Sequence, residues 1–126
     1  MTRIVRLAGS ARADILDILE RSEAEFGAEA RVRYERLISA ALHDLSAAPE
    51  RPGSAARPEL GADLRTWHLR GSRERARGPD GTVRRPRHLL LYTIIDDRIV
   101  GVLRVLHDAV ELHRHLQWDD EDAAPK

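Results

Sequence analysis

RHLLLYTIIDDRIVGVLRVLH, residues 87–107, contains the two most apolar segments of the chain, Arg87–Ile95 and Arg98–His107. Nearly every position in both segments is β-branched or apolar, which is typical of central strands that are buried on both faces. Only Asp96 and Asp97 separate them, and a connection this short predicts a tight hairpin. The sequence therefore predicts an antiparallel strand pair at the centre of the protein.

The pattern changes after this hairpin. From Asp108 the spacing of Val110, Leu112 and Leu116 fits a short helix over about 109–116, with Asp108 as its N-cap. An acidic tail, residues 119–126, follows Trp118, and we expect it to be frayed.

The segment before the hairpin predicts another strand and a loop. Within Arg57–Arg70 the chain turns at Gly61, and Trp67 and Leu69 then alternate with polar residues, as in a strand with one face on the core. Residues 71–86, GSRERARGPDGTVRRP, have no periodicity and are rich in Gly, Pro and Arg. They predict an exposed, mobile, Arg-rich loop.

The N-terminal third predicts one strand and two helices. Residues 3–7, RIVRL, read as a short strand, and Ser10 is a plausible N-cap for a helix over Ala11–Phe26. Gly27 is well placed to end that helix, and Pro49 ends a second one. The apolar stripe of the second helix contains Tyr34, Leu37, Ile38, Ala41, Leu42 and Leu45. With so short a connection, the two helices should form an antiparallel hairpin.

These elements give the order β-α-α-β-β-β with a short C-terminal helix. We expect an α+β fold in which the helical hairpin packs on one face of a small, antiparallel-rich sheet. At 126 residues the chain should form a single domain over residues 1–118, followed by the tail.

Composition excludes several classes of function. The chain has no cysteine, so disulfides, thiolate zinc sites and a Cys nucleophile are excluded. The formal net charge is zero, which by itself predicts neither nucleic-acid nor membrane binding. The N-terminus lacks the apolar core of a signal peptide, and no segment approaches the length of a membrane span. We expect a soluble, cytoplasmic protein without membrane association or direct sequence-specific DNA binding.

Three histidines near the C-terminus suggest a metal site, but their spacing argues against one. His113 and His115 are two positions apart on the expected helix and point away from each other, whereas His107 belongs to the preceding strand. No carboxylate pair completes a ligand set. We therefore expect no metal and no cofactor.

Cationic side chains on the expected strands are the remaining catalytic candidates. They are Arg65, His68, Arg70, Arg87, His88, Arg104 and His107. Arg and His on a sheet face could stabilise a phosphate and move a proton, as in metal-free RNA cleavage. However, Arg104 and His107 are three positions apart and face opposite sides of a regular strand. Alternatively, Arg104 pairs with a carboxylate and His107 packs where the strand meets the helix.

Four segments together resemble the RelE/ParE superfamily of bacterial toxins, and specifically its ParE branch. SARADILDI (Ser10–Ile18) resembles the start of the first helix, and RPELGADLRTWHL (Arg57–Leu69) resembles the P-E-L-G-x-x-L-R turn. HLLLYTIIDDRIVGVLRVLH (His88–His107) resembles the aromatic-bearing hairpin, and RVLHDAVEL (Arg104–Leu112) resembles the R-[VI]-L-H-x-x-x-[DE]-L signature. The resemblance covers most of residues 3–116. Loop 71–86 is longer than the family's usual link between these strands.

The resemblance implies a partner and a target. ParE-like toxins are neutralised by a cognate ParD-like antitoxin, which wraps the helical hairpin and the sheet, and characterised members act on DNA gyrase. The RelE branch instead cleaves mRNA on the ribosome, and here Arg65, Arg104 and His107 would serve such a metal-independent endoribonuclease. The expected residues of target or antitoxin contact are Arg65, Trp67, His68, Arg70, Tyr92, Arg104, His107 and Leu112. The signature and the absence of an evident acid–base pair favour the non-enzymatic gyrase inhibitor.

Overall fold

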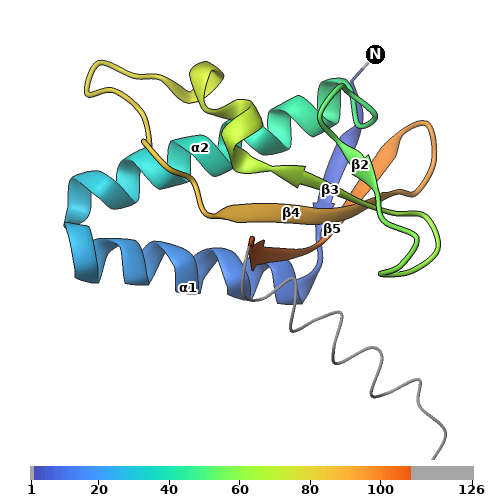
Figure 1. Ribbon diagram of the computed structural model, residues 1–126, viewed down its shortest axis with the longest axis horizontal. Helices are drawn as coiled ribbons and strands as arrows, with labels where there is room; N and C mark the ends of the chain where they lie inside the picture. Colours follow the sequence, from blue (N-terminus) through green and yellow to red (C-terminus); the bar gives the residue numbers. More distant parts are fainter. Residues whose placement is uncertain (1, 109–126) are drawn as a thin grey trace, which may run out of the picture.

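The structure is a computed structural model that describes residues 2–108, and it has two long helices against a five-stranded sheet (Figure 1). The elements are β1 (Ile4–Leu7), α1 (Gly9–Phe26), α2 (Ala28–Ala47), β2 (Ala55–Ala56), β3 (Leu64–His68), β4 (His88–Ile94) and β5 (Ile99–His107). Two short 3-10 turns, η1 (Leu69–Ser72) and η2 (Glu74–Ala76), follow β3. The expected C-terminal helix and the acidic tail lie outside the described residues.

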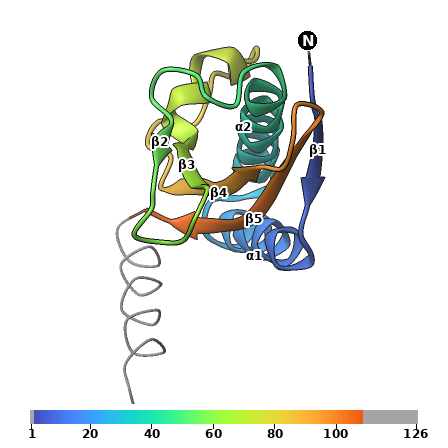
Figure 2. The same ribbon diagram turned by 90° about the vertical axis from the view of Figure 1, so that its right-hand side faces the viewer.

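The sheet has the strand order β1-β5-β4-β3-β2, and Figure 2 shows β1 and β2 at its opposite edges. β1 runs parallel to β5, and the other neighbours are antiparallel. The expected α+β arrangement is thus confirmed. The edge strand β2 was not predicted, because two alanines are too short a segment to show any periodicity; main-chain pairing with Arg65 and Thr66 holds it in place.

The predicted central hairpin is confirmed. In its turn the Asp96 carboxylate accepts hydrogen bonds from the backbone N–H groups of Arg98 and Ile99, at 2.7 and 2.9 Å. The register shifts between Leu91 and Tyr92 of β4, which marks a β-bulge opposite them on β5.

The two helices form the predicted antiparallel hairpin, which Figure 1 shows along one side of the sheet. Gly27 joins them with φ +95°, a left-handed conformation that favours glycine, and its N–H donates to the Glu23 carbonyl at 2.9 Å. The prediction of Ser10 as N-cap was wrong: α1 begins at Gly9, and the Ser10 hydroxyl instead donates to the Leu103 carbonyl on β5 at 2.8 Å.

The core lies on both faces of β4 and β5, as the apolar pattern predicted. The helix-facing cluster includes Leu37, Leu45, Trp67, Leu90, Tyr92, Val100, Val102 and Val105. The opposite face carries a smaller buried cluster of Leu60, Leu89, Leu91 and Leu106, with Leu64 packed against it.

Segment 71–86, here called the insert, is more ordered and more buried than its sequence suggested. Its first half contains the end of η1 and all of η2, which pack along α2 (Figure 1). Ser72 and Ala76 are buried, so the expectation of an exposed loop was wrong for these two residues. In the second half of the insert, Asp80 pairs with Arg36 at 3.0 Å and with Arg33 at 3.8 Å. These ion pairs connect this half to α2.

Candidate functional site

The first candidate residue, Arg104, is held at the edge of β5 by helix α1. Its Nε and Nη2 donate to the Asp14 carboxylate at 2.7 and 3.1 Å, and the Val105 N–H donates to the same carboxylate at 2.9 Å. β1 pairs with β5 only as far as Val102. Asp14 therefore takes the place of a strand neighbour beyond the end of β1, and Arg104 has the carboxylate partner that was one of its two expected roles.

Three aromatic rings meet where β4 begins and β5 ends. His88 and His107 are directly opposite each other in the register, and their rings contact edge to face with centroids 5.5 Å apart. On the other side of His88 the Tyr34 ring from α2 makes a second such contact at 5.6 Å. The Tyr34 hydroxyl lies 2.6 Å from His88 Nδ1 and accepts the Arg87 N–H at 3.4 Å. The hydroxyl therefore donates a hydrogen bond to His88 Nδ1.

Burial keeps this pair uncharged at neutral pH. Desolvation is the main reason that the pKa of His88 falls to about 4, and the neighbouring His107 lowers it further. Desolvation likewise raises the pKa of Tyr34 to about 12, against the opposing effect of the Arg87 N–H. A neutral His88 that accepts from a neutral phenol is the result.

Asp108 links His107 to a third histidine, His68 at the end of β3. One oxygen of its carboxylate lies 2.8 Å from His68 Nε2, and the other lies 3.7 Å from His107 Nδ1. His68 Nδ1 accepts the Arg70 N–H at 3.0 Å. Since Nδ1 is an acceptor, the ring proton of His68 is on Nε2, and this N–H donates a hydrogen bond to Asp108. A chain of contacts thus crosses α2, β4, β5 and β3 at one end of the sheet.

The three residues expected to serve RNA cleavage do not converge. Arg65 pairs in register with Tyr92, which in turn pairs with Val102. His107 is five residues further along β5, a separation of roughly 15 Å along the strand. The side chains of Arg65 and Arg104 are moreover engaged with different groups, since Arg65 Nη2 donates to Ser54 Oγ at 2.7 Å.

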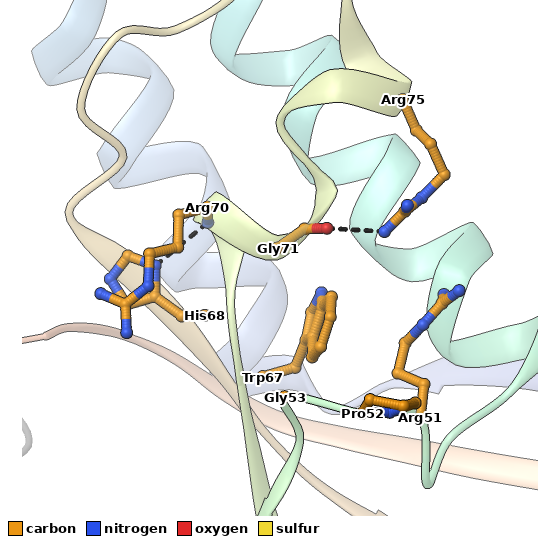
Figure 3. Close-up of a pocket in the computed structure, with 8 residues that line it drawn as sticks. All are labelled: Arg51, Pro52, Gly53, Trp67, His68, Arg70, Gly71 and Arg75. Atoms are coloured by element: carbon orange, nitrogen blue, oxygen red, sulfur yellow. Dashed lines mark hydrogen bonds between the residues drawn. The ribbon is translucent and has the colours of Figure 1, made fainter.

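A pocket of about 420 Å³ opens beside Trp67 (Figure 3). Its lining contains Arg51, Pro52, Gly53, Trp67, His68, Arg70, Gly71 and Arg75. Figure 3 shows Arg51 and Arg75 on one side of the indole, and Arg70 with His68 on the other. The indole lies between two glycines: a Cβ built on Gly71 would come within 2.4 Å of the Trp67 ring, and one on Gly53 within 3.0 Å.

Asp44 of α2 binds two of the arginines that line this pocket. Its carboxylate is 4% exposed and accepts from Arg75 Nε at 2.7 Å and from the Ser72 hydroxyl at 2.6 Å. A second guanidinium, that of Arg51, lies 3.1 Å away, and Ser72 in turn accepts the Trp67 indole N–H at 2.9 Å. Two arginines share one carboxylate, so the rim of the pocket keeps a net positive charge.

Some of the expected contact residues are core residues. Tyr92 is fully buried, with its hydroxyl donating to the Pro49 carbonyl, and Trp67 is 4% exposed. Tyr92 therefore lies in the core rather than on a contact surface, because its position in β4 faces the helices. Leu112 lies outside the described residues.

Several residues of the site were missed from the sequence. Asp44 had a usable signal, since it lies three residues after Ala41 on the buried face of α2, where a carboxylate needs partners. Asp14, Ser72 and Arg75 had none, because their partners are distant in sequence and depend on how β5 and the insert pack on the helices.

A second surface of interest is a wide groove of about 1140 Å³ between the helical hairpin and residues 80–88. It is lined from α1 by Arg21 and Phe26, from α2 by Arg33 and Tyr34, and from the sheet by His88 and His107, among others. Phe26 is 74% exposed. Within residues 2–108 no helix is long and apolar enough to cross a membrane, and no group of three or more His, Asp or Glu is placed to hold a metal ion.

Two helices on a five-stranded mixed sheet with this order of elements define the class of the protein, the RelE/ParE-like fold. The family model for the ParE toxin of the type II toxin–antitoxin system parDE matches residues 5–111. The chain therefore belongs to the ParE toxin family.

A solved structure described as the chromosomal ParDE TA system from P. aeruginosa has the same fold. Its chain superposes with a TM-score of 0.59 at 16% sequence identity, covering 84% of this chain and 96% of that chain. No curated protein sequence matches this chain at a significant level.

Proposed function

We propose that this chain is the active toxin of a type II toxin–antitoxin pair, that it works in the cytoplasm, and that it inhibits DNA gyrase by binding to the surface of that enzyme. A cognate ParD-like antitoxin would neutralise it. The observation that carries the proposal is the match of residues 5–111 to the ParE toxin family. The similar chain of the P. aeruginosa ParDE system supports it at the level of the fold.

Exposed apolar side chains on the helical hairpin support a protein partner. Leu16 and Phe26 of α1 and Val32 of α2 are at least half exposed, and the groove beside residues 80–88 runs along the same hairpin. Phe26 lines this groove, and exposed apolar surface at a groove is typical of a protein–protein interaction site. We assign this side of the molecule to the antitoxin.

The engagement of the cationic residues supports a non-enzymatic mechanism. Arg104 is paired with Asp14, and Arg65 is bonded to Ser54, so neither side chain is poised over a common phosphate position. Inhibition by surface contact needs no such convergence. It needs a few anchor residues. Arg65 and Arg104 are among the contact residues expected from the sequence, whereas Trp67 is buried.

The second candidate function is a RelE-like, metal-independent endoribonuclease. The specific observation that favours it is the chain of contacts from Tyr34 through His88 and His107 to Asp108 and His68. General acid–base catalysis uses connected titratable side chains of this kind. This reading would place the chemistry at His107 and His88 and would leave Arg65 outside it.

The test is inducible expression of the chain in a bacterial host, alone and together with the protein encoded by the adjacent gene. We expect growth arrest with induction of the DNA-damage response and continued protein synthesis, and relief of the arrest by the co-expressed neighbour. Arrest with immediate loss of protein synthesis and with cut transcripts would support the endoribonuclease instead. In that case His107→Ala should restore growth, whereas the exposed His43→Ala should not.

A further inference from the structure

The pocket beside Trp67 has the chemistry of an anion-binding site. Three guanidinium groups, of Arg51, Arg70 and Arg75, line it, and the only carboxylate that they contact among residues 2–108 is Asp44. Asp44 is buried beneath the pocket and compensates one of the three positive charges. About two positive charges remain at a depression of about 420 Å³.

Arg70 is the residue most available to a ligand. It is exposed and pairs with no carboxylate among residues 2–108, whereas its backbone N–H is fixed by His68 Nδ1 at 3.0 Å. Arg75 is fixed by two acceptors, since its Nε donates to Asp44 and its Nη2 donates to the Gly71 carbonyl at 2.6 Å. Its side chain is still 49% exposed. The opening is thus flanked by one preorganised guanidinium and by one that has no carboxylate partner among residues 2–108.

Apart from His68, the remainder of the lining is apolar and permits a close approach of main chain. Pro52, Gly53 and Gly71 form the rim around the edge of Trp67. Arg51 lies over the indole ring, 5.5 Å from its centroid, which fixes the guanidinium on the aromatic face. A negatively charged group on an apolar segment would match both the arginines and the apolar part of the lining.

A protein carboxylate fits this surface better than a nucleic-acid backbone. A backbone needs a basic track that contacts successive phosphates. Along the insert, carboxylates interrupt the row of arginines, because Glu74 pairs with both Arg73, at 3.0 Å, and Arg77, at 3.1 Å. Farther along, Asp80 similarly occupies Arg36. The pocket itself is a single depression of about 420 Å³, which suits one side chain better than a run of successive phosphates.

We propose that the Trp67 pocket binds an Asp or Glu side chain of the antitoxin, which Arg70 and Arg75 receive as an ion pair. The proposal rests on the proposed function, because it names the chemistry by which the same antitoxin is recognised. It also gives a role to the insert, which supplies Arg75 and the backbone of Gly71 to the pocket.

The test is titration calorimetry of the purified chain with the protein encoded by the adjacent gene. The variants are Arg70→Glu, Arg75→Lys and, as a matched control, Arg98→Glu in the β4–β5 turn at the other end of β4. Arg98 is also exposed, and its side chain forms no ion pair with any other of residues 2–108. We expect Arg70→Glu to weaken binding about tenfold or more, Arg75→Lys to weaken it less, and Arg98→Glu to leave it unchanged. Circular dichroism and the unfolding temperature of Arg70→Glu should match the wild type.

A double-mutant cycle then identifies the partner residue. Each Asp and Glu of the antitoxin is changed to Asn or Gln, and one of these changes should lose its effect in the Arg70→Glu background. Unchanged affinity of Arg70→Glu, or a loss no greater than that of Arg98→Glu, would overturn the proposal. If Arg70→Glu instead loses binding to a short DNA or RNA duplex while its affinity for the antitoxin is unchanged, the proposal is also overturned, and the ligand of the pocket is a nucleic acid. If the wild-type chain does not bind the neighbour at all, the proposed function itself fails.

Discussion

The hydroxyl of Ser72 donates a hydrogen bond of 2.6 Å to the carboxylate of Asp44, 28 residues earlier in the chain. Ser72 lies in η1 and Asp44 near the end of α2, so this bond fixes the start of the insert to the helical hairpin. Ser72 is fully buried and Asp44 is 3% exposed. The bond therefore forms part of the core and supports the Trp67 pocket.

Asp44→Asn should destabilise the fold by about 2–4 kcal/mol, because Arg75 and Arg51 lose a buried counter-charge. The free energy of unfolding from urea titration measures the effect. Glu35→Gln, on the exposed side of the same helix, is the matched control and should leave the unfolding midpoint unchanged. Equal midpoints for the two variants would show that the Asp44 network does not stabilise the fold.

Gly71→Ala should cost about 1–3 kcal/mol, since its Cβ would lie within 2.4 Å of the Trp67 ring and the indole would have to move. Gly9→Ala is the contrasting variant, because a Cβ there meets nothing within 4 Å and alanine favours the helix that begins at this position. Thermal unfolding should rank Gly9→Ala at or above the wild type and Gly71→Ala below it. The reverse order would contradict the packing of Trp67 between Gly53 and Gly71.

Asp14→Ala should destabilise the protein by about 1–3 kcal/mol, because Arg104 and the Val105 N–H both lose their acceptor at the edge of β5. Amide hydrogen exchange at Val105 should accelerate as well. The exposed Asp17→Ala, which breaks an ion pair with Arg21 within α1, serves as the control. Unchanged exchange at Val105 in Asp14→Ala would refute the role of Asp14 as a substitute strand neighbour.

His88 should make the stability depend on pH. Its pKa is about 4 in the folded protein and near 6.5 in the unfolded chain, so the unfolded state binds more protons between these values. The stabilisation is complete above about pH 6.5 and is lost as the pH falls toward 4, by about 1–3 kcal/mol.

Urea titrations at pH 7 and pH 5 measure this loss. His88→Gln keeps an acceptor for Tyr34 but cannot titrate, so it should flatten the dependence in this window. His43→Gln, at an exposed position of α2, should leave the dependence as in the wild type. An equally steep loss of stability in His88→Gln would exclude His88 as the responsible group.

The fold could be predicted largely from local patterns. The apolar runs of 87–107 define β4, β5 and the Asp96 turn. Apolar residues that recur every three or four positions define both helices. β2 could not be predicted in this way, because two alanines in a Pro/Gly-rich segment acquire their structure only from pairing with β3. The insert was misjudged for a related reason: its order depends on contacts with Asp44 and Asp80 rather than on periodicity.

The candidate site was less predictable than the fold. Sequence spacing separated Arg104 from His107 and led to the carboxylate partner as one alternative, which Asp14 provides. It could not show that His107 lies opposite His88, because that contact depends on the register of a hairpin that contains a bulge. The Trp67 pocket is likewise a property of the tertiary fold, because the segment after α2, strand β3 and the insert all contribute to its lining.

The most direct test of the central claim is a DNA gyrase assay with the purified chain. ATP-dependent supercoiling and accumulation of cleaved plasmid are measured with increasing chain, and again after addition of the protein from the adjacent gene. We expect that the chain blocks supercoiling, that cleaved plasmid accumulates, and that the added partner reverses both effects. Full gyrase activity in the presence of excess chain, together with cleavage of mRNA on ribosomes by the same preparation, would contradict it.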